Sequence, residues 1–315
     1  MSAEHRWACL AAARDHRPGC RLPWWLADDQ GRWRPCGSVS RAQLPSLLEW
    51  LRALGAPASE HPSGLRLPWT PVSQEVLLDR LNLQLRQAGL IPGWRDERFA
   101  LWPLDLPRHL CRHGAEGRPM LRMERAAARF WGSLTLGAHC NGWVAGPGGR
   151  PAMLWIGRRA RHKATDPGRL DNLVGGGVPD GQSPDEALWR EGWEEAGFGL
   201  DRMRSARPSG VIELLHDLPE GLQRECLHVY DLELQPGERP VNQDGEVAEF
   251  LCLPVQEALE RAAMGEMTLD AALVTLDFGL RHGMLRTDEA TDLIAWVDRL
   301  KVGSDSESCS KFCNA

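Results

Sequence analysis

The sequence has no long apolar run and no paired-cysteine motif. No stretch reaches the roughly 18 apolar residues that a membrane-spanning helix needs. The charged first residues, Met1 to Arg6, lead into no apolar core and do not have the pattern of a secretory signal. The nine cysteines are scattered, without the C-x-x-C pair that indicates a zinc or redox site. We therefore expect a cytoplasmic protein without a membrane segment.

An excess of basic residues is also absent. Lys and Arg total 37, Asp and Glu total 43, and the formal net charge is -6. This balance gives no general attraction for nucleic acid or for an anionic membrane, although a local basic pocket is compatible with it. Lysine itself is scarce, because only Lys163 precedes Lys301 and Lys311 near the end of the chain. Lys163 is therefore a candidate for a specific role.

What is present is the composition of a globular protein. The 315 residues are 43% hydrophobic and 25% charged, which excludes disordered and fibrous classes and suits one large domain or two ordinary ones. Residues 1–120 read as a first unit, with helical periodicity from Leu44 to Leu54 that Gly55 ends, and a second helix over 74–89. Pro and Gly between these segments mark connections.

The pattern changes at Met123, where a second unit over 121–302 begins to show clear elements. A hairpin is predicted from extended segments at 135–145 and 152–158 joined by a Gly-Pro-Gly-Gly turn. The other predicted elements are helices over 123–130, 184–196, 255–264, 269–282 and 287–302, strands over 210–215 and 226–234, and a flexible tail over 303–315. A Gly175-Gly176-Gly177 turn is expected before the helix that starts near Pro184.

Three glutamates stand on one face of that helix. Glu191, Glu194 and Glu195 have the spacing i, i+3 and i+4, so their carboxylates can reach a common cation. Hard oxygen ligands suit Mg²⁺ or Mn²⁺, which also bridge to substrate phosphates. Arg190 can orient one of these carboxylates through a charge-assisted hydrogen bond. Taken alone, three glutamates at this spacing favour a solvated acidic helix face over a metal site.

The surrounding residues resemble the Nudix box, G-x5-E-x7-R-E-U-x-E-E-x-G-U, where U is apolar. Gly176, Arg190-Glu191, Glu194-Glu195, Gly197 and Phe198 occupy its fixed positions. Gln182 stands where the box has its first Glu, and Gly192 where it has an apolar residue. The resemblance implies hydrolysis of a diphosphate by water with Mg²⁺, the helix glutamates as metal ligands, and Gly176 as a sharp turn beside the phosphates. The change at Gln182 leaves the number of metals open.

Other stretches resemble one Nudix subfamily, which has its own N-terminal domain and is also found fused to thiamine pyrophosphokinase. Residues 154–159, Lys163 and residues 167–174 are similar to its W-I-x-x-R…K…P-G-x-L-D-N-x-V signature. Further agreement comes from residues 139–142, 244–250 and 280–283. This resemblance implies hydrolysis of thiamine diphosphate, and preferentially of its damaged oxo and oxy analogues, to the monophosphate and phosphate, a metabolite repair. It implies a Nudix α/β/α sandwich preceded by a smaller α+β N-terminal domain.

Residues outside the helix complete the predicted site. Glu246 is a candidate metal ligand or general base, against an exposed turn glutamate. Lys163 and Arg159 are candidates to contact the diphosphate, together with Gly176 and Gly177. His139 and Asn141 alternate on one strand face, so they either read a ring by hydrogen bonds or form a satisfied buried pair. Six tryptophans could stack on the ring, although most are expected in the core: Trp24, Trp25, Trp143, Trp155, Trp189 and Trp193.

Two alternatives stay open at this point. One is a Nudix pyrophosphohydrolase for nucleotides, such as an oxidised nucleoside diphosphate or ADP-ribose. The other is a non-catalytic sensor of a diphosphate, which the missing glutamate at Gln182 suggests. In all three readings the partner is a small-molecule diphosphate, and the oligomeric state is open.

Overall fold

The computed structural model describes residues 6–56, 59–61, 64–67, 71–105, 119–285, 293–295, 297–298 and 300–301. The tail expected over 303–315 lies outside these residues, as does most of the helix expected over 287–302. Across the described residues, no helix is both long enough and apolar enough to cross a membrane.

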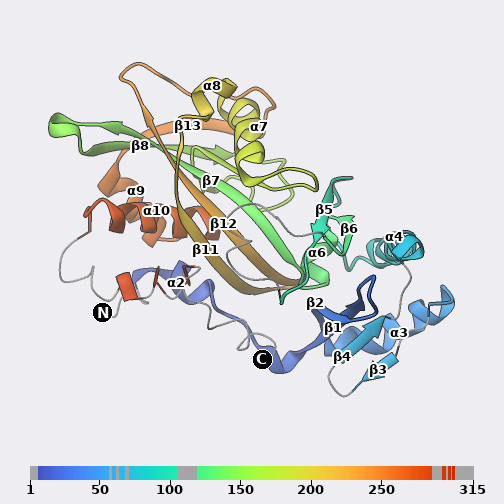
Figure 1. Ribbon diagram of the computed structural model, residues 1–315. Coiled ribbons are helices and arrows are strands. Elements are labelled where there is room, and N and C mark those ends of the chain that lie inside the picture. Colours follow the sequence, from blue (N-terminus) through green and yellow to red (C-terminus); the bar gives the residue numbers. More distant parts are fainter. Residues whose placement is uncertain are drawn as a thin grey trace.

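A seven-stranded sheet forms the centre of the larger, C-terminal lobe (Figure 1). Its strands are β7 (Leu134–Ala145), β8 (Pro151–Arg159), β9 (Leu170–Asp171), β10 (Val174–Gly177), β11 (Arg207–Leu218), β12 (Gly221–Leu234) and β13 (Val247–Pro254). The order is β11-β12-β7-β8-β13, with β10 paired to β7 and β9 to β8. β7 runs parallel to β12, whereas the other pairs are antiparallel.

Helices cover both faces of this sheet (Figure 1). α7 (Pro184–Ala196) and α8 (Leu200–Met203) lie on one face, and α9 (Val255–Ala263) and α10 (Leu269–Arg281) on the other. Side chains along β7 point alternately to the two faces of the sheet. Those of Leu136, Ala138 and Cys140 enter the core under α7. The expected α/β/α sandwich is confirmed.

The smaller, N-terminal lobe has an α+β arrangement, also as expected. Its sheet has the order β2-β1-β4-β3, formed by β1 (Arg21–Ala27), β2 (Trp33–Ser40), β3 (Ser59–His61) and β4 (Gly64–Leu67). It also contains α3 (Leu44–Ala53), α4 (Pro71–Gln87), the paired strands β5 (Arg98–Leu101) and β6 (Leu121–Glu124), and α6 (Ala127–Phe130). We use the name N-terminal lobe for residues 21–131, whose buried side chains form one core from Leu22 to Trp131.

The division of the chain at residue 120 stays a prediction. The core of the N-terminal lobe continues through Trp131. The helix α2 (Ala8–Ala12) instead packs in the core of the other lobe, through Leu10 and through Trp7, which precedes the helix. The two lobes are therefore interleaved at the beginning of the chain.

Two local predictions were wrong. Residues 123–130 are not one helix, since Leu121 and Met123 alternate inward on strand β6 and α6 begins only at Ala127. The glycines at 175–177 are not a turn but part of strand β10, which pairs antiparallel with β7. In both cases pairing with a distant strand determined the backbone, and local sequence contained no sign of that partner.

Candidate functional site

The helix α7 begins and ends at residues that fix its position. Ser183 caps its first turn in a capping box, in which its hydroxyl accepts from the Glu186 amide (3.2 Å) and the Glu186 carboxylate accepts from the Ser183 amide (2.8 Å). Pro184 occupies the first turn, and Gly197 ends the helix with a left-handed φ of 71°. The carboxylates that follow the cap are therefore held on a well-defined helix.

Packing explains why Gly192 stands where the box has an apolar residue. A β-carbon at this position would lie 2.6 Å from the side chain of Met203 on α8. The missing side chain thus allows α8 to pack closely on α7.

Two of the three glutamates are buried and one is partly exposed. Glu191 and Glu195 are 9% and 6% exposed, whereas the Glu194 side chain is 38% exposed. Arg190 bridges Glu191 and Glu194, donating to Glu191 Oε1 (2.9 Å) and Glu194 Oε2 (2.7 Å). It also donates a long hydrogen bond to the Gln182 side-chain oxygen (3.4 Å), so Gln182 helps to orient the arginine. Arg190 therefore orients two of the three carboxylates.

Of the two buried glutamates, Glu195 has the larger shift in pKa. Its Oε2 accepts a hydrogen bond from the Gly175 amide (2.9 Å). Burial, and then the neighbouring Glu191, raise the pKa of Glu195 to about 8. Burial also raises the pKa of Glu191, against the opposing effect of Arg190. Because Glu191 and Glu195 are buried neighbours whose negative charges repel, a cation beside them would be favourable.

Gly176 faces Glu191 across the space between β10 and α7. A β-carbon at Gly176 would lie 2.3 Å from Glu191 Oε1, so only glycine leaves room for this carboxylate. The expectation of a sharp turn was wrong, because Gly176 lies in the extended backbone of β10. Gly177 has a similar role, since a β-carbon there would lie 2.6 Å from the ring of Phe99.

A polar cavity of about 240 Å³ opens over these carboxylates. It brings together eight of the predicted site residues: Glu191, Glu194, Glu195, Arg190, Glu246, Lys163, Arg159 and Gly176. Lys163 is ion-paired with Glu246. Arg159 donates to Asp171 Oδ2 (2.8 Å) and to the Thr165 carbonyl oxygen, so Asp171 positions it.

Several further residues that line the cavity were not among the predicted site residues. Arg95, Glu97 and Arg125 line it from the N-terminal lobe, and Thr165 and Asp244 complete it. Arg125 donates to Glu97 Oε2 (2.9 Å), and its guanidinium lies 5.2 Å from the centre of the Phe99 ring. Asp244 lies in the stretch 244–250 that resembles the subfamily, but the sequence has no signal that places Arg95 and Arg125 here.

Comparison with known proteins agrees with this geometry. Residues 136–272 match the family described as NUDIX domain. The chain contains a NUDIX domain. It is 36% identical over 205 residues to Nudix hydrolase 24, chloroplastic, of Arabidopsis thaliana, a match over 65% of this chain and 53% of that protein. Nudix hydrolase 20, chloroplastic, of the same plant is also 36% identical, over 65% of this chain and 52% of that protein.

A third relative is more distant. GDP-mannose pyrophosphatase of Yersinia enterocolitica is 27% identical over 115 residues, which cover 35% of this chain and 56% of that protein. The chain spans about half the length of the curated relatives that it matches.

The donor set in the NUDIX domain fits a divalent cation by type. Carboxylate oxygens are the ligands that Mg²⁺ and Mn²⁺ prefer, and burial of Glu191 and Glu195 disfavours their charge without a cation. The described residues contain no group of three His, Cys, Asp or Glu already in a ligating arrangement. Arg190 pairs with two of these carboxylates, so a cation at Glu191 and Glu194 would share them with it or displace it.

The structure places His139 and Asn141 away from this cavity. They lie on the face of β7 that α10 covers, and they are 6% and 2% exposed. His139 Nδ1 is 3.0 Å from Asn172 Oδ1, and Asn141 Nδ2 donates to Asp231 Oδ1 (3.0 Å). Asn172 also donates to Asn141 Oδ1 (3.3 Å). Of the two readings considered for these residues, the arrangement corresponds to the satisfied buried pair.

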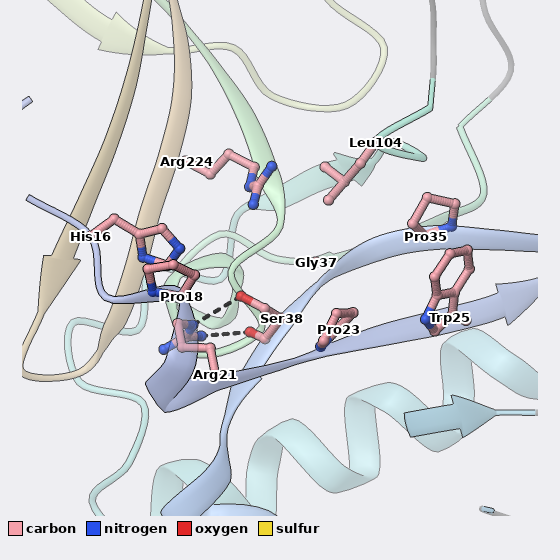
Figure 2. A pocket seen from close by; sticks show the side chains of 10 residues that line it. All are labelled: His16, Pro18, Arg21, Pro23, Trp25, Pro35, Gly37, Ser38, Leu104 and Arg224. Atoms are coloured by element: carbon pink, nitrogen blue, oxygen red, sulfur yellow. Dashed lines mark hydrogen bonds between the residues drawn. The ribbon is translucent and has the colours of Figure 1, made fainter. Parts of the chain in front are cut away.

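None of the six tryptophans singled out from the sequence lines the cavity either. Trp24 is fully buried and donates to the Trp131 carbonyl oxygen (2.8 Å), and Trp193 is 54% exposed. Trp25 lines a separate cavity of only about 30 Å³, in which Arg21 donates to Ser38 Oγ (2.9 Å) (Figure 2). That space has room for roughly one water molecule and shares no residue with the polar cavity.

Proposed function

We propose that this protein hydrolyses a diphosphate with the help of a bound divalent metal ion, Mg²⁺ or Mn²⁺. The observation that carries the proposal is the convergence of Glu191, Glu194 and Glu195 with Glu246 on one polar cavity. The matched family and the names of the plant relatives support the reaction class.

The residues of the chain divide the chemistry among them. Glu191, Glu194 and Glu195 would hold the metal ion, which supplies stabilisation of the charge on the phosphate oxygens. Glu246 accepts the proton of the attacking water, and Lys163 orients Glu246 through their ion pair. The oxygen of that water forms a bond to phosphorus while the bond to the bridging oxygen breaks, which releases phosphate and leaves a monophosphate.

We further propose thiamine diphosphate, and preferentially its oxo and oxy analogues, as substrate. The support is the similarity of residues 154–174 and 244–250 to the signature of that Nudix subfamily. Removal of the terminal phosphate from a damaged analogue would release the enzymes that it inhibits. The polar lining of the cavity suits the diphosphate, and none of the aromatic residues described in the structure is among the lining side chains. A nucleotide substrate is the alternative, which the similarity to GDP-mannose pyrophosphatase favours.

A substrate panel tests both parts of the proposal. Phosphate release would be measured with Mg²⁺, with Mn²⁺ and with a chelator, on thiamine diphosphate, its oxo and oxy analogues, oxidised nucleoside diphosphates and ADP-ribose. For ADP-ribose, which yields two monophosphates, phosphate is detected after phosphatase treatment. Preference for the thiamine analogues would support the repair function. Preference for a nucleotide would retain the reaction and reject the thiamine substrate, and tight binding without metal-dependent turnover would favour a sensor.

A further inference from the structure

The cations around the polar cavity differ in whether they already have a carboxylate partner. Four of them do: Lys163 pairs with Glu246, Arg159 with Asp171, Arg190 with Glu191 and Glu194, and Arg125 with Glu97. Arg95 also lines the cavity, and among the described residues its guanidinium has neither an ion pair nor a hydrogen bond. It is the cation in this part of the structure whose donors are available to a ligand.

The backbone holds Arg95 in place without help from its side chain. Its amide donates to Oε1 of the buried Glu124 (2.9 Å). The next residue, Asp96, has a left-handed φ of 57°, which is uncommon outside glycine, and its carboxylate accepts from the Trp94 indole (2.7 Å). Arg86 lies over the Trp94 ring at 4.8 Å. The segment is therefore fixed, and an unusual backbone conformation is maintained at the edge of the cavity.

The N-terminal lobe also contacts residues 177–180, which run from the end of strand β10 toward helix α7. The Asp180 amide donates to the Arg98 carbonyl oxygen (2.9 Å), and its carboxylate pairs with Arg122 (2.6 Å). Gly177 completes the attachment, because it has room for Phe99 of β5. These contacts hold the segment that carries Arg95 beside the strand and helix that carry Gly176 and Glu191.

We propose that Arg95 binds phosphate oxygens of the substrate, with Arg125 beside it, so that the N-terminal lobe supplies part of the diphosphate site. The proposal rests on the proposed function and names the residues that recognise its substrate class. A guanidinium binds phosphate through two parallel hydrogen bonds, and an arginine without a partner needs no rearrangement to do so. Arg95, Arg125 and Arg159 around one cavity repel one another, and a polyanionic ligand would relieve that repulsion.

Arg95→Gln tests this directly, with Arg80→Gln as matched control. Arg80 is an exposed arginine of the same lobe, on α4 and outside the cavity, so its replacement changes net charge equally. Calorimetry with methylenediphosphonate, a diphosphate that cannot be hydrolysed, would be run with Mg²⁺ for wild type and both variants. We expect the Kd to rise at least about tenfold for Arg95→Gln, as the loss of a charge-assisted hydrogen bond implies, and not for Arg80→Gln. Arg95→Lys should recover part of the affinity.

Turnover separates this role from the proposed function. With a substrate identified by the panel, Arg95→Gln should raise KM by a similar factor and leave kcat within about threefold, because the contact is present in both the ground state and the transition state. The melting temperature should not change, since the Arg95 side chain has no hydrogen-bond or ion-pair partner among the described residues. Equal Kd for wild type and Arg95→Gln, or an equal loss in Arg80→Gln, would overturn the proposal. A protein that binds through Arg95 but hydrolyses no diphosphate would instead refute the proposed function.

Discussion

A β-carbon on Gly176 would lie 2.3 Å from Oε1 of Glu191. This distance is far shorter than a van der Waals contact, so the glycine that begins the box and the first of its three candidate metal-binding glutamates depend on each other. Gly176 lies on strand β10 and Glu191 on helix α7, so the glycine sets how closely the strand and the carboxylate can approach.

Gly176→Ala should therefore reduce turnover by about a hundredfold, comparable to the loss of one strong electrostatic stabiliser, because Glu191 must move. Overpacking should also cost about 1 to 3 kcal/mol of the free energy of unfolding. Steady-state kinetics and urea unfolding would measure the two effects. Gly199→Ala is the control, since Gly199 has an ordinary φ of -66° and a β-carbon added there would have no atom within 4 Å beyond its chain neighbours. Equal turnover of both variants would show that catalysis does not depend on the placement of the Glu191 carboxylate beside Gly176.

Asn141→Ala should affect stability and leave substrate binding unchanged. Asn141 bonds to Asp231 and Asn172 in the interior, so its removal leaves two buried polar groups with one partner fewer. We expect a loss of about 1 to 3 kcal/mol in the free energy of unfolding, and a KM within about twofold of wild type. Chemical unfolding and steady-state kinetics would measure both quantities. A raised KM with normal stability would mean that Asn141 contacts the substrate after all.

Asp270 should make the folded protein less stable as pH rises. Burial, and then the neighbouring Glu225, raise the pKa of Asp270 to about 7 from an ordinary value of 3.8. Between these two values the folded state binds more protons than the unfolded state, so the free energy of unfolding falls as pH rises from about 4 to 7. Gln223 lies between the two carboxylates, donating to Glu225 Oε2 (2.8 Å) and Asp270 Oδ1 (3.3 Å).

Asp270→Asn removes this titration. Urea unfolding at pH 5 and pH 8 should show that the variant gains about 1 to 3 kcal/mol relative to wild type at the higher pH. A constant difference between the two proteins at both pH values would contradict the raised pKa.

The helix of the candidate site could be predicted well, because its signals are local. Ser183, Pro184 and Gly197 define where α7 begins and ends, and the spacing of Glu191, Glu194 and Glu195 defines their common face. The segments that pack against the sheet and the cavity from elsewhere in the chain could not be predicted in the same way.

Alternation along β7 correctly placed His139 and Asn141 on one face of a strand, but not under α10. Arg95 reaches the cavity only because the paired strands β5 and β6 dock on residues 177–180. Contacts between segments so far apart in the chain have no local pattern in one sequence.

The most direct test of the account is the turnover of Glu195→Gln with Mg²⁺ on the preferred diphosphate. Glutamine keeps the size of the side chain and can still accept the hydrogen bond from the Gly175 amide, so the fold should persist. Because the variant lacks the buried carboxylate, we predict that kcat falls at least about a hundredfold, with unfolding curves close to those of wild type. Turnover equal to that of wild type would contradict the assignment of the α7 carboxylates to the metal ion and, with it, the proposed reaction site.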